Sequence, residues 1–83
     1  MSHTPHELAD EFPQDRELIH RLKQDDAHFA RLADDYHTLN RTIHRIESET
    51  EAASDERTEA LKKERLALAD QISAMLAKAR TPA

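Results

Sequence analysis

The sequence predicts an all-α fold: an antiparallel helical hairpin of the coiled-coil type, preceded by a short helix. Large apolar residues recur at spacings of three, four and seven between residues 18 and 46, and again between 61 and 75. Such heptad spacing gives a helix one narrow apolar stripe that packs against another helix. The 83-residue chain contains no glycine, so nothing of that kind weakens either helix. Cysteine is also absent, so packing rather than disulfides must stabilise the fold.

A short first helix is expected over residues 5–12 of a single small domain that spans residues 1–83. Thr4 can cap this helix, and Pro5 suits its first position. Pro13 ends the helix, because the residue before a proline is held away from helical angles.

A long helix is then expected over residues 13–51, a turn over 51–54 and a second long helix over 55–80. Ser54 stands where the second helix needs an N-cap. One continuous rod is the alternative. The apolar residues after the turn are one position out of step with the first run, which favours a chain reversal over a rod.

Folding the chain at this turn brings the two apolar runs together, and we call the result the hairpin seam. Its predicted residues are Phe29, Leu32, Tyr36, Leu39, Ile43, Ile46, Leu61, Leu68, Ile72 and Met75. Because two helices enclose little, Ala33, Leu66 and Leu76 are expected on uncovered flanks. A core this thin rarely contributes more than about 3–5 kcal/mol.

Two polar residues, Asp25 and Arg65, also fall on the predicted stripes. They either bind a partner or fix the register and orientation of the helices, as polar residues in coiled coils can. In the expected hairpin Asp25 lies near Lys78 and Arg80, which could neutralise its charge.

The start of the long helix extends beyond the reach of the second helix. Leu18, Ile19 and Leu22 would stay exposed there, forming an apolar strip that is uncommon on a stable monomer. Either the segment Leu8–Phe12 folds back over the strip or a second chain packs on it. We favour the second chain, which makes the protein a homo-oligomer, most simply a dimer forming a helical bundle.

Charge and hydropathy argue against nucleic-acid and membrane partners. The net charge is −5, all of it within residues 1–50, which is the wrong sign for neutralising phosphates. The longest apolar stretch is four residues, whereas spanning a bilayer takes about 20. No secretion signal is recognisable, so we expect a cytoplasmic protein.

No catalytic residue, cofactor or metal ligand is predicted. A chain without glycine has no phosphate-binding loop, and a two-helix hairpin has no enclosed site for catalysis. Six histidines raise the question of metal binding. However, His37 and His44 are about 10.5 Å apart along a helix, and His44 with Glu47 offers two ligands where structural zinc takes four.

Three segments resemble the YdcH-like family of short bacterial proteins: residues 6–13 (HELADEFP), 22–47 and 54–68. Together the likeness extends from residue 6 to about 77. It implies a helical hairpin from a bacterium, and it supplies no catalytic or ligand residues because the family's biochemical function is undefined.

The expected function is therefore that of a non-enzymatic helical interaction or adaptor protein, acting through self-association or through an unknown partner protein's helix. The alternative is a histidine-based module that responds to metal or pH, since histidine titrates near neutrality.

Overall fold

The computed structural model describes residues 7–80. In chain order its elements are α1 (Leu8–Glu11), a 3-10 helix η1 (Pro13–Asp15), α2 (Arg16–Asp25), α3 (Ala27–Glu47) and α4 (Asp55–Arg80). These residues contain no strand, and the predicted all-α class is confirmed. The expected cap Thr4 and the first helical residue Pro5 lie outside the described residues.

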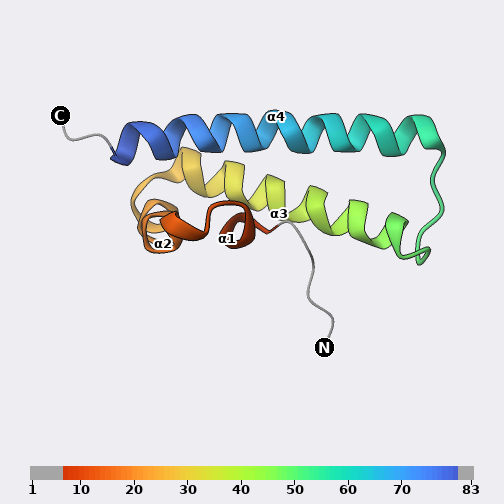
Figure 1. Ribbon diagram of the computed structural model, residues 1–83, viewed down its shortest axis with the longest axis horizontal. Coiled ribbons are helices and arrows are strands. Elements are labelled where there is room, and N and C mark those ends of the chain that lie inside the picture. Colours follow the sequence, from red (N-terminus) through yellow and green to blue (C-terminus); the bar gives the residue numbers. More distant parts are fainter. Residues whose placement is uncertain (1–6, 81–83) are drawn as a thin grey trace.

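The two longest helices, α3 and α4, lie side by side and run in opposite directions (Figure 1). The chain reverses between them in a loop of residues 48–54. Ser54 caps α4, since its hydroxyl accepts a hydrogen bond of 3.1 Å from the N–H of Arg57. Asp55 and Glu56 occupy the first turn of α4, where the helix dipole favours acidic residues.

The prediction of one long helix over residues 13–51 is wrong, because Asp26 interrupts it. Asp26 is extended, with φ −128° and ψ 104°. Its carboxylate accepts hydrogen bonds from the N–H groups of His28 (3.0 Å) and Phe29 (3.1 Å). A short acidic side chain can thus satisfy the first N–H groups of a new helix, which competes with continuing the old one.

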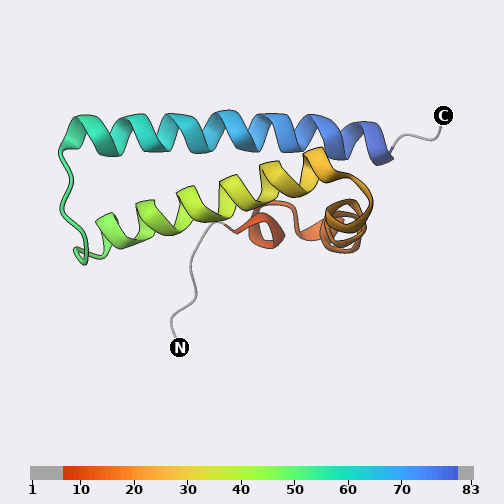
Figure 2. The same ribbon diagram turned by 180° about the vertical axis from the view of Figure 1, so that it is seen from behind.

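This break redirects the N-terminal part of the chain. In Figures 1 and 2 α2 is seen end-on, so it runs across the axis of α3, and α1 lies back against the same side of the pair. Together α1 and α2 cover a flank that the sequence placed in solvent. Leu76 is fully buried and Ala33 is 3% exposed, so their expected exposure is wrong, whereas Leu66 is 63% exposed.

The first long helix was also expected to reach residue 51, but α3 ends at Glu47. The end has the Schellman arrangement: the N–H of Glu49 donates to the carbonyl of Ile46 and the N–H of Thr50 to that of Arg45. Glu49 has φ 63°, a left-handed conformation that glycine usually supplies and that strains other residues.

Burial predicts which apolar side chains stabilise the fold. Phe29→Ala should lower the free energy of unfolding by about 3–5 kcal/mol, because Phe29 is 0% exposed. Leu66→Ala should change it by less than about 0.5 kcal/mol, because Leu66 stays in contact with water. Urea unfolding followed by circular dichroism measures both, and equal losses would mean that the core lies elsewhere.

Glycine at position 49 should stabilise the protein. Glu49→Gly relieves the left-handed strain, and we expect a gain of about 0.5–1 kcal/mol, seen as a rise of several degrees in Tm. Glu49→Ala is the matched control, because it removes the same charge and keeps the Cβ atom that causes the strain. An equal rise in both variants would attribute the gain to charge.

Candidate interaction surfaces

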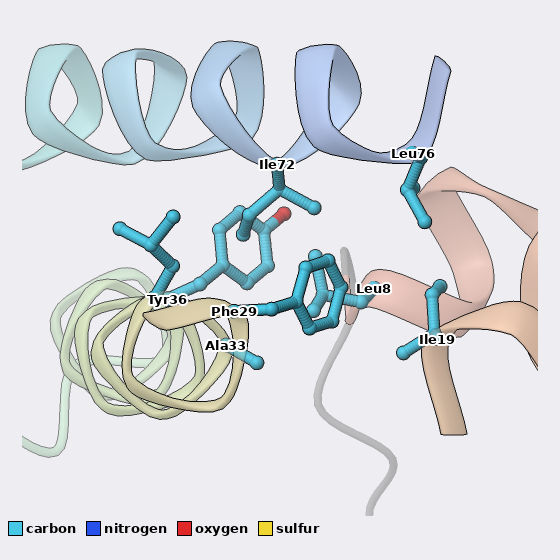
Figure 3. Close-up of a cluster of buried hydrophobic side chains, with 8 residues drawn as sticks. Leu8, Ile19, Phe29, Ala33, Tyr36, Ile72 and Leu76 are labelled. Carbon is cyan, nitrogen blue, oxygen red and sulfur yellow. The ribbon is translucent and has the colours of Figure 1, made fainter. Parts of the chain in front are cut away.

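The α3–α4 pair has two faces, and the first is covered by α1 and α2. Figure 3 shows Leu8 of α1 and Ile19 of α2 pointing into a cluster with Phe29 and Ala33 of α3 and Leu76 of α4. Each of these five side chains is between 0 and 6% exposed. The N-terminal segment therefore supplies a third layer to a core that two helices cannot enclose alone.

A chain of polar contacts joins three parts of the molecule beside this cluster. Asn40 of α3 is only 1% exposed. Its side-chain oxygen accepts a hydrogen bond of 3.0 Å from Arg65 of α4, and its nitrogen donates to Glu7, just before α1, at 3.5 Å. The other carboxylate oxygen of Glu7 lies 3.0 Å from Nδ1 of His37. The oxygen and the nitrogen of the Asn40 side chain thus both have hydrogen-bond partners. Through these bonds Asn40 of α3 connects Glu7 to α4.

A second polar contact holds the N-terminal segment near its middle, at the end of η1. Nε of Arg80 lies 3.2 Å from Oδ1 of Asp15, whose side chain is nearly buried. The expected pairing of Arg80 with Asp25 is wrong, because Arg80 contacts Asp15 instead, and Asp25 is exposed at the end of α2, where the break occurs. Arg65, by contrast, makes a contact between α3 and α4, as a residue that fixes register would.

Burial changes the acidity of the tyrosine in the core. Tyr36 is 2% exposed, and loss of contact with water raises the pKa of its phenol to about 12. The nearby carboxylate of Glu11 adds to the rise, and the guanidinium of Arg65 opposes it. The phenol therefore stays neutral throughout the physiological range.

The second face of the α3–α4 pair carries an open groove of about 540 Å³. Its lining residues are Asp35, Thr38, Leu39 and Thr42 of α3, and Arg57, Leu61, Glu64, Ala67, Leu68 and Gln71 of α4. Leu39, Leu61 and Leu68 are half-buried, so they give the groove an apolar floor between polar rims. This arrangement suits an amphipathic helix.

The predicted seam residues differ in burial: five are buried and five are half-buried. The buried ones are Phe29, Leu32, Tyr36, Ile43 and Ile72. The half-buried ones are Leu39, Ile46, Leu61, Leu68 and Met75. Of the half-buried residues, Leu39, Leu61 and Leu68 keep apolar surface in the groove, while Met75, like Leu68, also packs against the core cluster.

The three residues predicted to meet a second chain have a different environment from the one expected. Ile19 is 5% exposed, and Leu18 and Leu22 are half-buried against the core cluster. The premise that they stay exposed within one chain is wrong, because the bend at Asp26 folds α2 onto the core. Their contact with a second chain stays a prediction.

The sequence reasoning missed the covered face, although a weak signal existed. Ala33, Tyr36, Asn40 and Ile43 follow one another at spacings of three, four and three, which defines a stripe on α3. This stripe includes an alanine and an asparagine, so a search for large apolar residues does not detect it.

Between α1, α2 and α3 lies a smaller hollow of about 430 Å³, with Arg16, His20 and Lys23 on the α2 side and Asp34 and His37 on the α3 side. Across residues 7–80 no group of three or more histidine, cysteine, aspartate or glutamate side chains is placed to hold a metal ion. The histidine-based alternative therefore gains no support from this part of the chain. No helix in the same range is long and apolar enough to cross a membrane.

The family model described as Protein of unknown function (DUF465) matches residues 29–76, which is more than half of the chain. The match runs from Phe29 in α3 through the loop to Leu76 in α4. DUF465 is the YdcH-like family, so the resemblance inferred from the sequence is confirmed. No curated protein and no solved structure matches the chain.

The raised pKa of Tyr36 predicts a loss of stability at high pH. A free tyrosine ionises near pH 10, so the preference of the fold for the neutral phenol acts fully below pH 10 and is lost between 10 and 12, by up to about 2–3 kcal/mol. The chain has one tyrosine, so tyrosinate absorbance should rise near pH 12 in the native protein and near pH 10 in denaturant. Tyr36→Phe should lose less stability over this range, and a native midpoint near 10 would contradict the burial.

Proposed function

Because the chain belongs to DUF465, a family of proteins of unknown function, we propose its role from its surfaces: it is a non-enzymatic helical interaction protein that binds a further helix in the groove between α3 and α4. The observation that carries this proposal is the half-buried leucine floor of Leu39, Leu61 and Leu68 in a groove that charged residues border. Apolar surface of this kind, bordered by polar residues, is typical of helix-binding grooves.

The dimensions of the groove support a helical occupant. From Arg57 to Gln71 the α4 wall is about 21 Å long at 1.5 Å per residue, which matches about four turns of a partner helix. The rims carry both signs of charge, with Asp35 and Glu64 against Arg57. They can therefore pair with a mixed polar flank on either side of an apolar stripe.

A second copy of the chain is the occupant that we propose. Leu61 and Leu68 are equally distant from a point near residues 64 and 65. A two-fold axis at that point brings Leu61 of each copy level with Leu68 of the other, and the two α3–α4 pairs then form a four-helix arrangement. Because the contact is short, we expect micromolar affinity rather than a permanent dimer.

Ala67→Glu tests this role with little risk to the fold, because Ala67 lines the groove and is exposed. A carboxylate there must lose its water when a second helix docks. Sedimentation analysis over a range of concentrations should show association of the native protein and at least tenfold weaker association of the variant.

Leu66→Glu is the matched control, because Leu66 is on the same helix, is 63% exposed and does not line the groove. Its association should equal that of the native protein, and both variants should keep native helicity. Ala67→Glu associating normally would remove the groove as the interface. A native protein that stays monomeric at millimolar concentration would remove the second copy as its occupant.

A further inference from the structure

The break at Asp26 is confined to one residue, and helical hydrogen bonding continues on both sides of it. The N–H of Asp26 donates to the carbonyl of Leu22 at 2.8 Å, as in a helix, and its carbonyl accepts from Ala30 at 2.9 Å. Only the extended angles of Asp26 and the two hydrogen bonds to its carboxylate separate α2 from α3. The break between α2 and α3 therefore lies at this single position.

The residues on either side of this hinge are arranged symmetrically. Ile19 and Ala33 are each seven residues from Asp26, and both line the hollow between α2 and α3. If two joined helices lay antiparallel with their Asp26 residues level, Ile19 of one chain would come level with Ala33 of the other. The contact that closes one chain on itself is therefore also available between two chains.

We propose that the chain exchanges its N-terminal segment, residues 7–25, with a second copy of itself. In the exchanged form Asp26 is helical and residues 16–47 make one helix of about 48 Å. Leu18, Ile19 and Leu22 of each copy then cover the flank of the other that includes Ala33 and Leu76. This interface is separate from the α3–α4 groove and does not rest on the function proposed for it.

The apolar contact, rather than charge, supports a second copy as the partner, because both helices carry charges of both signs. The basic residues of α2 are accompanied by Glu17 and Asp25, and the first half of α3 carries Arg31 as well as acidic residues. Exchange of this kind needs little new surface, because Leu18, Ile19 and Leu22 cover the same flank in both forms. The crossing angle differs, since α2 crosses α3 in the closed form (Figure 1) and lies antiparallel to α3 of the other copy in the exchanged form.

The balance between the closed and exchanged forms should depend on the cap at Asp26. Asp26→Ala removes the carboxylate and introduces the residue most favourable to a continuous helix. Since a dimer contains two hinges, we expect the association constant to rise by roughly tenfold or more. Asp26→Asn is the matched control, because asparagine caps as well as aspartate does.

Ala27→Pro locks the hinge in the closed form. Ala27 is exposed and is the first residue of α3, the position at which proline suits a helix. Proline also holds the residue before it in an extended conformation, which Asp26 already has. The same substitution would disrupt a continuous helix, so this variant should remain closed at every concentration.

Cross-linking identifies which chain supplies the segment. His20 and Asp34 are exposed and line the same hollow, and the native chain has no cysteine. A His20→Cys, Asp34→Cys protein treated with a short bis-maleimide should be linked within one chain in the closed form. In the exchanged form the two positions of one chain are about 21 Å apart along a helix, so the reagent can join only different chains.

The experiment compares four proteins by light scattering and cross-linking: one with the native hinge, and the variants Asp26→Ala, Asp26→Asn and Ala27→Pro. All four also carry the substitution Ala67→Glu, which removes association through the groove. Exchange predicts covalent dimers that increase with Asp26→Ala, stay at the native level with Asp26→Asn and disappear with Ala27→Pro. An Asp26→Ala protein that is monomeric, or that forms dimers linked only within chains, would overturn the proposal. Circular dichroism of each variant confirms that the helices persist.

Discussion

The two hydrogen bonds that the carboxylate of Asp26 accepts determine the course of the N-terminal part of the chain. Without them, the spacing of apolar residues would carry one helix from Arg16 to Glu47 and leave α2 without a neighbour. With them, α2 turns across α3 and α1 returns along its side. One side chain near the start of α3 thus decides whether the N-terminal apolar residues pack on their own chain or project into water.

The need for this bend follows from how little two helices can bury. Each helix of a pair covers one side of the other, and in a chain of this size such a core contributes only a few kcal/mol. Leu8 and Ile19 supply the missing cover on one side. The contacts of Glu7 with His37 and Asn40, and of Asp15 with Arg80, hold the start and the middle of the covering segment in place. Apolar burial stabilises the layer, and the polar contacts specify where it lies.

Periodicity predicts the helices and much of the interior, because a buried stripe must repeat with the helical turn. It found Phe29, Tyr36 and Ile72, which are among the most deeply buried residues. It did not find the bend, because Asp26 occupies a position where aspartate is also an ordinary surface residue of a long helix. Nor did it find the burial of Asn40, because an asparagine becomes an interior residue only when partners such as Glu7 and Arg65, distant in sequence, arrive beside it. Sequence patterns indicate local conformational preferences, whereas the bend at Asp26 and the burial of Asn40 depend on tertiary contacts.

The family match lies within the α3–α4 pair, from Phe29 to Leu76, and both of these residues are fully buried on the side that α1 and α2 cover. The matched part therefore contains an apolar flank that requires a covering element, together with a groove that remains open on the other face. A helix pair by itself would leave both of these apolar surfaces exposed to water. In the closed chain the N-terminal segment covers one of these surfaces, whereas the leucine floor formed by Leu39, Leu61 and Leu68 remains open on the other.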